Sequence, residues 1–190
     1  DARYQDLNGN NKIGAEDYQI IGNAMPKSAL GWNNTVSYKS FTFNFFFQGI
    51  FGVDKLNYTR CMALMGARDT RQPILSEINE RYIPGINESS DFPAFSTTSR
   101  IEPQSTLFLE NANFVRLKNI SLSYKLPNLV KGISECKVSV RGANLLTFTN
   151  YKGIDPETSN LSSASDINQG IDYGSYPNSK TYTIALSLTF

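Results

Sequence analysis

The chain has 190 residues and contains no histidine. This absence excludes Ser-His-Asp and Cys-His catalysis and most catalytic zinc sites. Charged residues make up only 18% of the chain, its net charge is +1, and no block of Lys or Arg is present. Soluble domains carry about 25% charged residues. A protein that follows a phosphate backbone needs a basic surface, so we expect no nucleic-acid partner.

Cysteine is scarce, and long apolar runs are missing. The two cysteines, Cys61 and Cys136, lack the spacing of a metal or redox motif and do not make a disulfide framework. No stretch approaches the roughly 18 apolar residues of a transmembrane helix. Aromatic residues are abundant, with twelve Phe and ten Tyr. If the chain crosses a membrane, it must therefore cross with strands.

Five segments alternate between apolar and polar residues, as strands with two unlike faces do. Each is close to the 9–11 residues with which a tilted β-strand crosses a bilayer. In one of them Phe41, Phe43, Phe45 and Phe47 share a face. The predicted strands are 28–39, 41–52, 112–124, 136–148 and 180–190.

The segment 112–124 alternates less regularly than the others. Ile120, Leu122 and Tyr124 share a face, and the same parity carried backward would place Lys118 and Arg116 in lipid. A charged side chain at mid-bilayer costs about 2–4 kcal/mol. We therefore predict either a β-bulge near Lys118 that switches the faces or an early exit from the membrane.

The connections between these strands alternate in length. Residues 39–40 and 125–135 are short connections, whereas 53–111 and 149–179 are long. Short periplasmic turns that alternate with long outer loops are typical of bacterial outer-membrane barrels. A soluble antiparallel sheet with one buried face alternates in the same way. The loop lengths, the strand lengths and the aromatic content favour the barrel.

Several stretches resemble the C-terminal part of SusC/RagA-like TonB-dependent transporters, in the order found in that family. They read DLNGNNKIGAEDYQIIGNAMPKSALGWNNTVSYKSFTFNFFFQG, FLENANFVRLKNISLSYKLP, VRGANLLTFTNYKGIDPE and YPNSKTYTIALSLTF. The resemblance implies an all-β fold in the bacterial outer membrane, in which residues 28–190 supply the last five antiparallel strands of a barrel of about 22 strands. Residues 1–27 would form an outer loop, and Phe190 resembles the terminal assembly signature of such barrels.

The resemblance also implies partners. A plug would fill the lumen, TonB would supply energy through an N-terminal segment that this chain lacks, and a SusD-like lipoprotein would help capture glycans or peptides. Five strands cannot close a barrel, because unpaired backbone groups would remain in lipid. The chain must then pair with the remainder of the same barrel. Barrel termini lie in the periplasm, so Cys61 would lie in an outer loop and Cys136 at the periplasmic side.

A calcium-loop pattern occurs near the N-terminus. Its predicted ligands stand at positions 1, 3, 5, 7 and 12 of such a loop: Asp6, Asn8, Asn10, Lys12 through its carbonyl, and Asp17. Asn11 stands where glycine usually makes the sharp turn, and Asn tolerates positive φ. The alternative is an Asx-rich loop that holds itself together with side-chain to backbone hydrogen bonds.

Other motifs keep two further functions open. Asp155 and Glu157 resemble a glycosidase carboxylate pair, but acids on a proline-containing loop are usually turn residues. We therefore expect no enzyme activity. A soluble calcium-containing carbohydrate-binding β-sandwich and a secreted glycan-active enzyme remain the alternatives. Several loop aromatics could stack on sugar rings or contact the lipoprotein cap, although such residues more often pack the loops against each other: Tyr58, Tyr82, Phe92, Phe95, Tyr151, Tyr173 and Tyr176.

Overall fold

The computed structural model describes residues 4–65, 76–90, 92–94, 104–127, 132–158 and 170–190. The chain divides into two compact units. We call the described parts of Ala24–Asp54, Asn111–Thr158 and Tyr176–Phe190 the sheet unit. The described parts of Asp1–Asn23, Lys55–Glu110 and Ser159–Ser175 form the loop unit.

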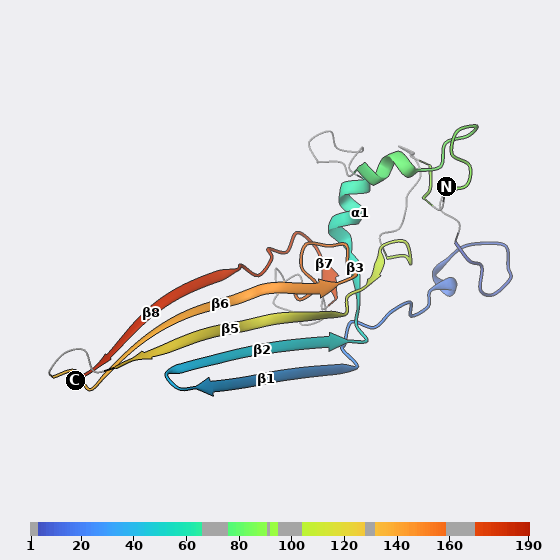
Figure 1. The fold of residues 1–190 in the computed structure, drawn as a ribbon. Coiled ribbons are helices and arrows are strands. Elements are labelled where there is room, and N and C mark those ends of the chain that lie inside the picture. The colour runs from blue at the N-terminus through green and yellow to red at the C-terminus, as the bar shows by residue number, and fades with distance from the viewer. Residues whose placement is uncertain (1–3, 66–75, 91, 95–103, 128–131, 159–169) are drawn as a thin grey trace. The chain divides into compact units, whose positions relative to one another are not determined.

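The sheet unit is a five-stranded antiparallel meander, which confirms the predicted strands to within two residues at each end. Its strands lie side by side in the order β1-β2-β5-β6-β8 (Figure 1). They are β1 Ser28–Tyr38, β2 Phe41–Phe51, β5 Phe114–Leu126, β6 Glu135–Thr149 and β8 Thr181–Thr189. Each strand therefore pairs with the strand that precedes it in this sheet, as in an up-and-down barrel wall.

The pairing register gathers the apolar side chains on one face, which we call the apolar face. One row across all five strands joins Val36, Phe43, Leu122, Val140 and Ile184. Ile184 is 80% exposed and Val140 is 51% exposed. Elsewhere on this face Trp32 stacks on Phe47, with ring centroids 6.1 Å apart. The described chain leaves these residues of the apolar face largely uncovered.

The bulge predicted near Lys118 is present. Leu117 pairs with Phe47 and Asn119 pairs with Phe46, so Lys118 is the extra residue. The insertion changes the parity of β5, so Arg116 lies on the opposite, polar face with its partner Thr147. Leu117 takes the apolar side in its place. This switch keeps Arg116 out of the apolar face, as the cost of a charge in lipid requires.

The loop unit adds structure that the strand prediction did not include. A small sheet has the order β4-β3-β7. The strands of this sheet are β3 Asp54–Asn57, β4 Leu109–Asn111 and β7 Ile171–Asp172. The other elements in the loop unit are the helix α1 Tyr58–Met65 and the 3-10 turns η1 Ala15–Asp17 and η3 Ser76–Glu80. The described parts of the long connections 53–111 and 149–179 therefore contain short strands, a helix and a 3-10 turn. In the described part of the chain, no helix is long and apolar enough to span a bilayer.

The core of the loop unit is built around Cys61, Leu64 and Phe108, with Leu56 and Phe92 packed against them. Cys61 has no exposed surface, and burial raises the pKa of its thiol to about 11. A buried neutral thiol is a poor nucleophile. Reagents in solution therefore do not reach this thiol in the folded chain. Neither Cys61 nor Cys136 forms a disulfide within the described residues.

Several loop aromatics pack, as expected for most of them. Tyr151 is buried with Val53 and Ala112 in the sheet unit. Tyr58 and Tyr173 make an edge-to-face contact in the loop unit, with ring centroids 5.0 Å apart. Tyr82 is half-buried, Tyr176 is 87% exposed, and Phe95 lies outside the described residues.

Candidate functional site

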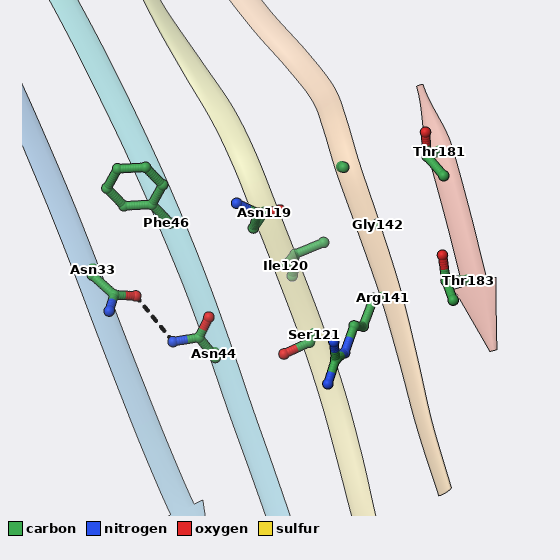
Figure 2. Close-up of a pocket in the computed structure, with 11 residues that line it drawn as sticks. Asn33, Asn44, Phe46, Asn119, Ile120, Ser121, Arg141, Gly142, Thr181 and Thr183 are labelled. Atoms are coloured by element: carbon green, nitrogen blue, oxygen red, sulfur yellow. Dashed lines mark hydrogen bonds between the residues drawn. The ribbon is translucent and has the colours of Figure 1, made fainter. Parts of the chain in front are cut away.

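The polar face of the five-stranded sheet carries a groove of ≈ 690 Å³ (Figure 2). It runs across the strands, because the residues that line it come from all five of them. The lining includes the amides and hydroxyls of Asn33, Asn44, Asn119, Ser121, Thr181 and Thr183, beside the apolar side chains of Phe46, Ile120 and Ala143. Arg141 is the one charged residue among those that line the groove.

Hydrogen bonds fix the orientation of Asn44 at one side of the groove. Its Nδ2 donates to Oδ1 of Asn33 at 3.0 Å and to Oγ1 of Thr35 at 2.8 Å. The bond to Asn33 is drawn in Figure 2. Because its donors are engaged within the sheet, the Oδ1 of Asn44 is the part of this amide left for a bound group.

A charge cluster lies on the same face of β5, two rows from Arg141. Arg116 has only 3% of its side chain exposed. Its Nη2 is 2.5 Å from Oδ1 of Asp155, its Nη1 is 2.6 Å from Oε2 of Glu157, and its Nε donates to Oγ1 of Thr147 at 2.9 Å. Lys118 forms a further ion pair with Glu157. The bulge therefore places Arg116 and Lys118 beside two acids, Asp155 and Glu157, of the loop that follows β6.

Asn178 ties the other end of that loop to the same acids. Its backbone N–H donates to Oδ2 of Asp155 at 2.9 Å, and its Nδ2 donates to Oε2 of Glu157 at 3.0 Å. The start of the connection between β6 and β8 is thereby joined to its end. We call Arg116, Lys118, Asp155, Glu157 and Asn178 the loop clamp.

The electrostatics of the clamp differ from those of a catalytic acid pair. Burial alone would raise the pKa of Asp155. The pKa is nevertheless lowered overall, because Arg116 donates a hydrogen bond and contributes its charge, and the N–H groups of Glu157 and Asn178 also donate to the carboxylate. A general acid needs a pKa raised toward neutrality. Asp155 is held as a carboxylate, which is the state of an ion-pair partner.

The structure brings the predicted calcium-loop residues into one self-bonded turn of the loop unit. Asp6 accepts from the N–H groups of Gly9 at 2.7 Å and Asn11 at 2.7 Å. Asn11 has φ +61°, the conformation for which glycine usually stands there. Asn8 accepts from Asn10, and Asn10 accepts from Lys12.

Asp17 closes this turn at its other end. Its Oδ1 accepts from Leu7 at 2.9 Å and its Oδ2 from Gly14 at 2.8 Å. The hydrogen bonds from Gly14 and Leu7 lower the pKa of Asp17. Among the described residues no group of three or more His, Cys, Asp or Glu side chains could hold a metal ion. The turn brings two carboxylates, Asp6 and Asp17, together with amide oxygens.

Comparison with known proteins decides the family resemblance. No family model matches the chain. The chain is 35% identical over 193 residues to TonB-dependent receptor P3 of Formosa agariphila, and 28% identical over 192 residues to TonB-dependent receptor SusC of Bacteroides thetaiotaomicron, in both cases over 98% of its length. A solved structure of the RagAB peptide importer matches with a TM-score of 0.77 and 27% identity, over 94% of this chain and 19% of that chain. The chain is a SusC/RagA-like barrel segment. It spans 19% of the length of the first of these receptors.

The matches confirm the predicted antiparallel sheet and the predicted bacterial outer-membrane location. The loop clamp is the part of this barrel segment that the sequence analysis missed. Two signals for it were available: cations in the irregular strand 112–124, and two acids in the loop that follows the neighbouring strand. The sequence pattern suggests a catalytic pair or turn residues at Asp155 and Glu157, and the structure shows both as partners of Arg116.

Proposed function

We propose that this chain is part of the wall of a TonB-dependent nutrient importer in the bacterial outer membrane. In the complete protein the barrel has about 22 strands, and its remaining strands close on β1 and β8. A plug fills the lumen. TonB drives the transport, and a SusD-like lipoprotein helps to capture oligosaccharides or peptides. The chain itself carries no chemistry, and Asp155 and Glu157 serve to hold a loop.

The two unlike faces of the sheet carry this proposal. Fully burying a Val, Leu, Ile or Phe side chain gains about 1.5–3 kcal/mol relative to leaving it exposed. On the apolar face Trp32 is 59%, Phe148 is 60%, and Tyr182 is 74% exposed. Lipid offers the missing burial along a row of strands whose opposite face is polar, the arrangement found in outer-membrane barrels.

The same observation weakens the two alternatives. A soluble carbohydrate-binding sandwich would bury the apolar face against a second sheet. The only other sheet among the described residues has three strands of two to four residues each. A glycan-active enzyme would need a carboxylic acid with a raised pKa, whereas the pKa of Asp155 is lowered.

The orientation follows from the same proposal. The turn at residues 39–40, the end of β5 and the start of β6 face the periplasm, and the loop clamp lies at the outer ends of the strands. Long outer loops are where a lipoprotein cap and an incoming substrate would make contact. The relatives are named as receptors and as a peptide importer, so both peptides and oligosaccharides are candidate cargoes.

Uptake by cells that carry the full-length protein tests the proposal. We expect import of fluorescent oligopeptides or oligosaccharides that stops when a protonophore removes the energy source of TonB. The matched control is the same protein with its TonB-contacting segment deleted. This variant should still assemble but should not import. A folded, monodisperse species of this chain in buffer without detergent would contradict the barrel wall and favour the sandwich.

Calcium in the turn of residues 6–17 is a second proposal. The positive φ of Asn11 and the closure of the turn by Asp17 support it, since both match the geometry of a calcium loop. With only two formal charges, the affinity should be modest. Calcium should protect residues 6–17 from protease in the full-length protein, and Asp6→Ala and Asp17→Ala should abolish the protection. Equal cleavage with calcium and with chelator in the unmutated protein would favour the self-bonded Asx turn.

A further inference from the structure

Arg141 is a cation in the polar face with no partner that the described residues supply. It stands in the middle of β6, opposite Ser121 of β5 and Thr183 of β8. The same row continues through Asn44 and Thr35. Within the described chain the guanidinium makes no hydrogen bond or ion pair, and no acid lines the groove around it.

Arg116 shows what the chain does with a comparable side chain on the same face. Arg116 is buried, and two carboxylates of the chain itself neutralise it. Arg141 is exposed in this structure and has no such neighbours among the described residues. Covering an unpaired guanidinium removes it from water at a large cost. A protein surface that covers the groove is therefore stabilised when it brings an anion to the guanidinium.

We infer that Arg141 anchors a carboxylate from the part of the same protein that lies inside the barrel. The inference rests on the proposed function, because that function places the polar face toward a filled lumen. The segment that would supply the acid lies outside this chain, which spans about a fifth of the length of its relatives. The groove of ≈ 690 Å³ has room for several of its side chains.

The chemistry around Arg141 suits a carboxylate better than a neutral group. A guanidinium presents a planar fork that matches the two oxygens of a carboxylate. The hydroxyls of Ser121 and Thr183, on the strands on either side, are additional donors for the same anion. A carboxylate fixed to the plug would meet this site whenever the plug is seated in the lumen. The pair would then hold the plug against this part of the wall.

The test uses the full-length protein, purified folded in detergent, and measures the rate at which a protease cleaves the luminal segment. Arg141→Glu should raise this rate about tenfold, the factor expected from loss of one charge-assisted hydrogen bond. Arg141→Lys keeps the charge and is the matched control, with a rate near that of the unmutated protein. Each Asp or Glu of the luminal segment is then changed to Arg in the Arg141→Glu background.

Restoration of the original rate by one of these changes, with that change alone also raising the rate, identifies the partner. A rate in Arg141→Glu equal to that in Arg141→Lys overturns the inference, as does a raised rate that no change restores. Unchanged cleavage together with reduced import of acidic peptides assigns Arg141 to the cargo and also overturns it. The gel shift of the unheated, unmutated protein separately shows whether the barrel itself forms.

Discussion

Removal of the Arg116 side chain should release the loop that follows β6. Arg116→Ala takes away the partner of Asp155 and one of the two cationic partners of Glu157. The site is almost completely buried, since the side chains of Arg116 and Asp155 are only 3% and 4% exposed. The substitution therefore leaves Asp155 as a buried carboxylate without its cation.

The expected magnitude follows from this geometry. Breaking a buried ion pair by removing one partner costs about 3–5 kcal/mol. Lys118 still pairs with Glu157, and two backbone N–H groups still reach Asp155, so the lower end applies. A loss of about 3 kcal/mol increases the open population of residues 150–158 about 150-fold.

Hydrogen exchange of the full-length protein in detergent measures this opening, in peptides that cover residues 150–158. Lys125→Ala is the matched control, because the pair Lys125–Glu135 has side chains 58% and 40% exposed. Exposed pairs contribute about 0–1 kcal/mol, and this one lies outside the clamp. Equal exchange of residues 150–158 in Arg116→Ala and Lys125→Ala would refute the view that the clamp holds the loop.

Three further predictions follow from the faces, the loop core and the clamp. Ile184→Arg, on the apolar face, should cost about 2–4 kcal/mol and lower the amount of assembled barrel seen as a heat-dependent gel shift. Ser187→Arg, on the polar face of the same strand and outside the groove, should assemble nearly normally. On intact cells a membrane-impermeant maleimide should leave Cys61 unlabelled until denaturant exposes it, because the thiol is buried and its pKa is about 11. The pKa of Asp155 is lowered from 3.8, so the stability that this carboxylate contributes to the loop should be complete above about pH 4. It should be lost only as the pH falls through the lower pKa of the folded state. Hydrogen exchange of residues 150–158, corrected for intrinsic rates, should therefore stay constant from about pH 7 to about pH 5.

The strands could be predicted because each carries its own signal. Alternation along 41–52 and 180–190 specifies which side chains share a face, and no distant contact is needed to read it. The bulge at Lys118 was predictable for a different reason. A charged residue in the apolar parity is costly enough that the backbone must change to avoid it, so the conflict in the sequence marks the position of the irregularity.

The structure of the connections could not be read in the same way. The core of Cys61, Leu64 and Phe108 joins residues that are far apart in the chain, and the strands of the loop unit have only two to four residues. Such short strands show no period. The contact between Arg116 and Asp155 spans 39 residues, so local pattern carries no information about it. Only charge complementarity between the irregular strand and the loop pointed toward it.

The two arginines of the polar face show how the surroundings of a charge indicate its role. Arg116 and Arg141 lie on neighbouring strands, two rows apart across the same sheet. The first is buried because its own chain supplies the acids, so it needs nothing from the rest of the protein. The second stands in an amide and hydroxyl groove without such acids among the described residues. If Arg141 were merely a solvated wall residue, Arg141→Glu would be as harmless as Ser187→Arg, which lies on the same face outside the groove. A docking residue differs from a solvated one in two measurable ways. Arg141→Glu raises the rate at which a protease cleaves the luminal segment, and a single acid-to-arginine change in that segment restores the original rate.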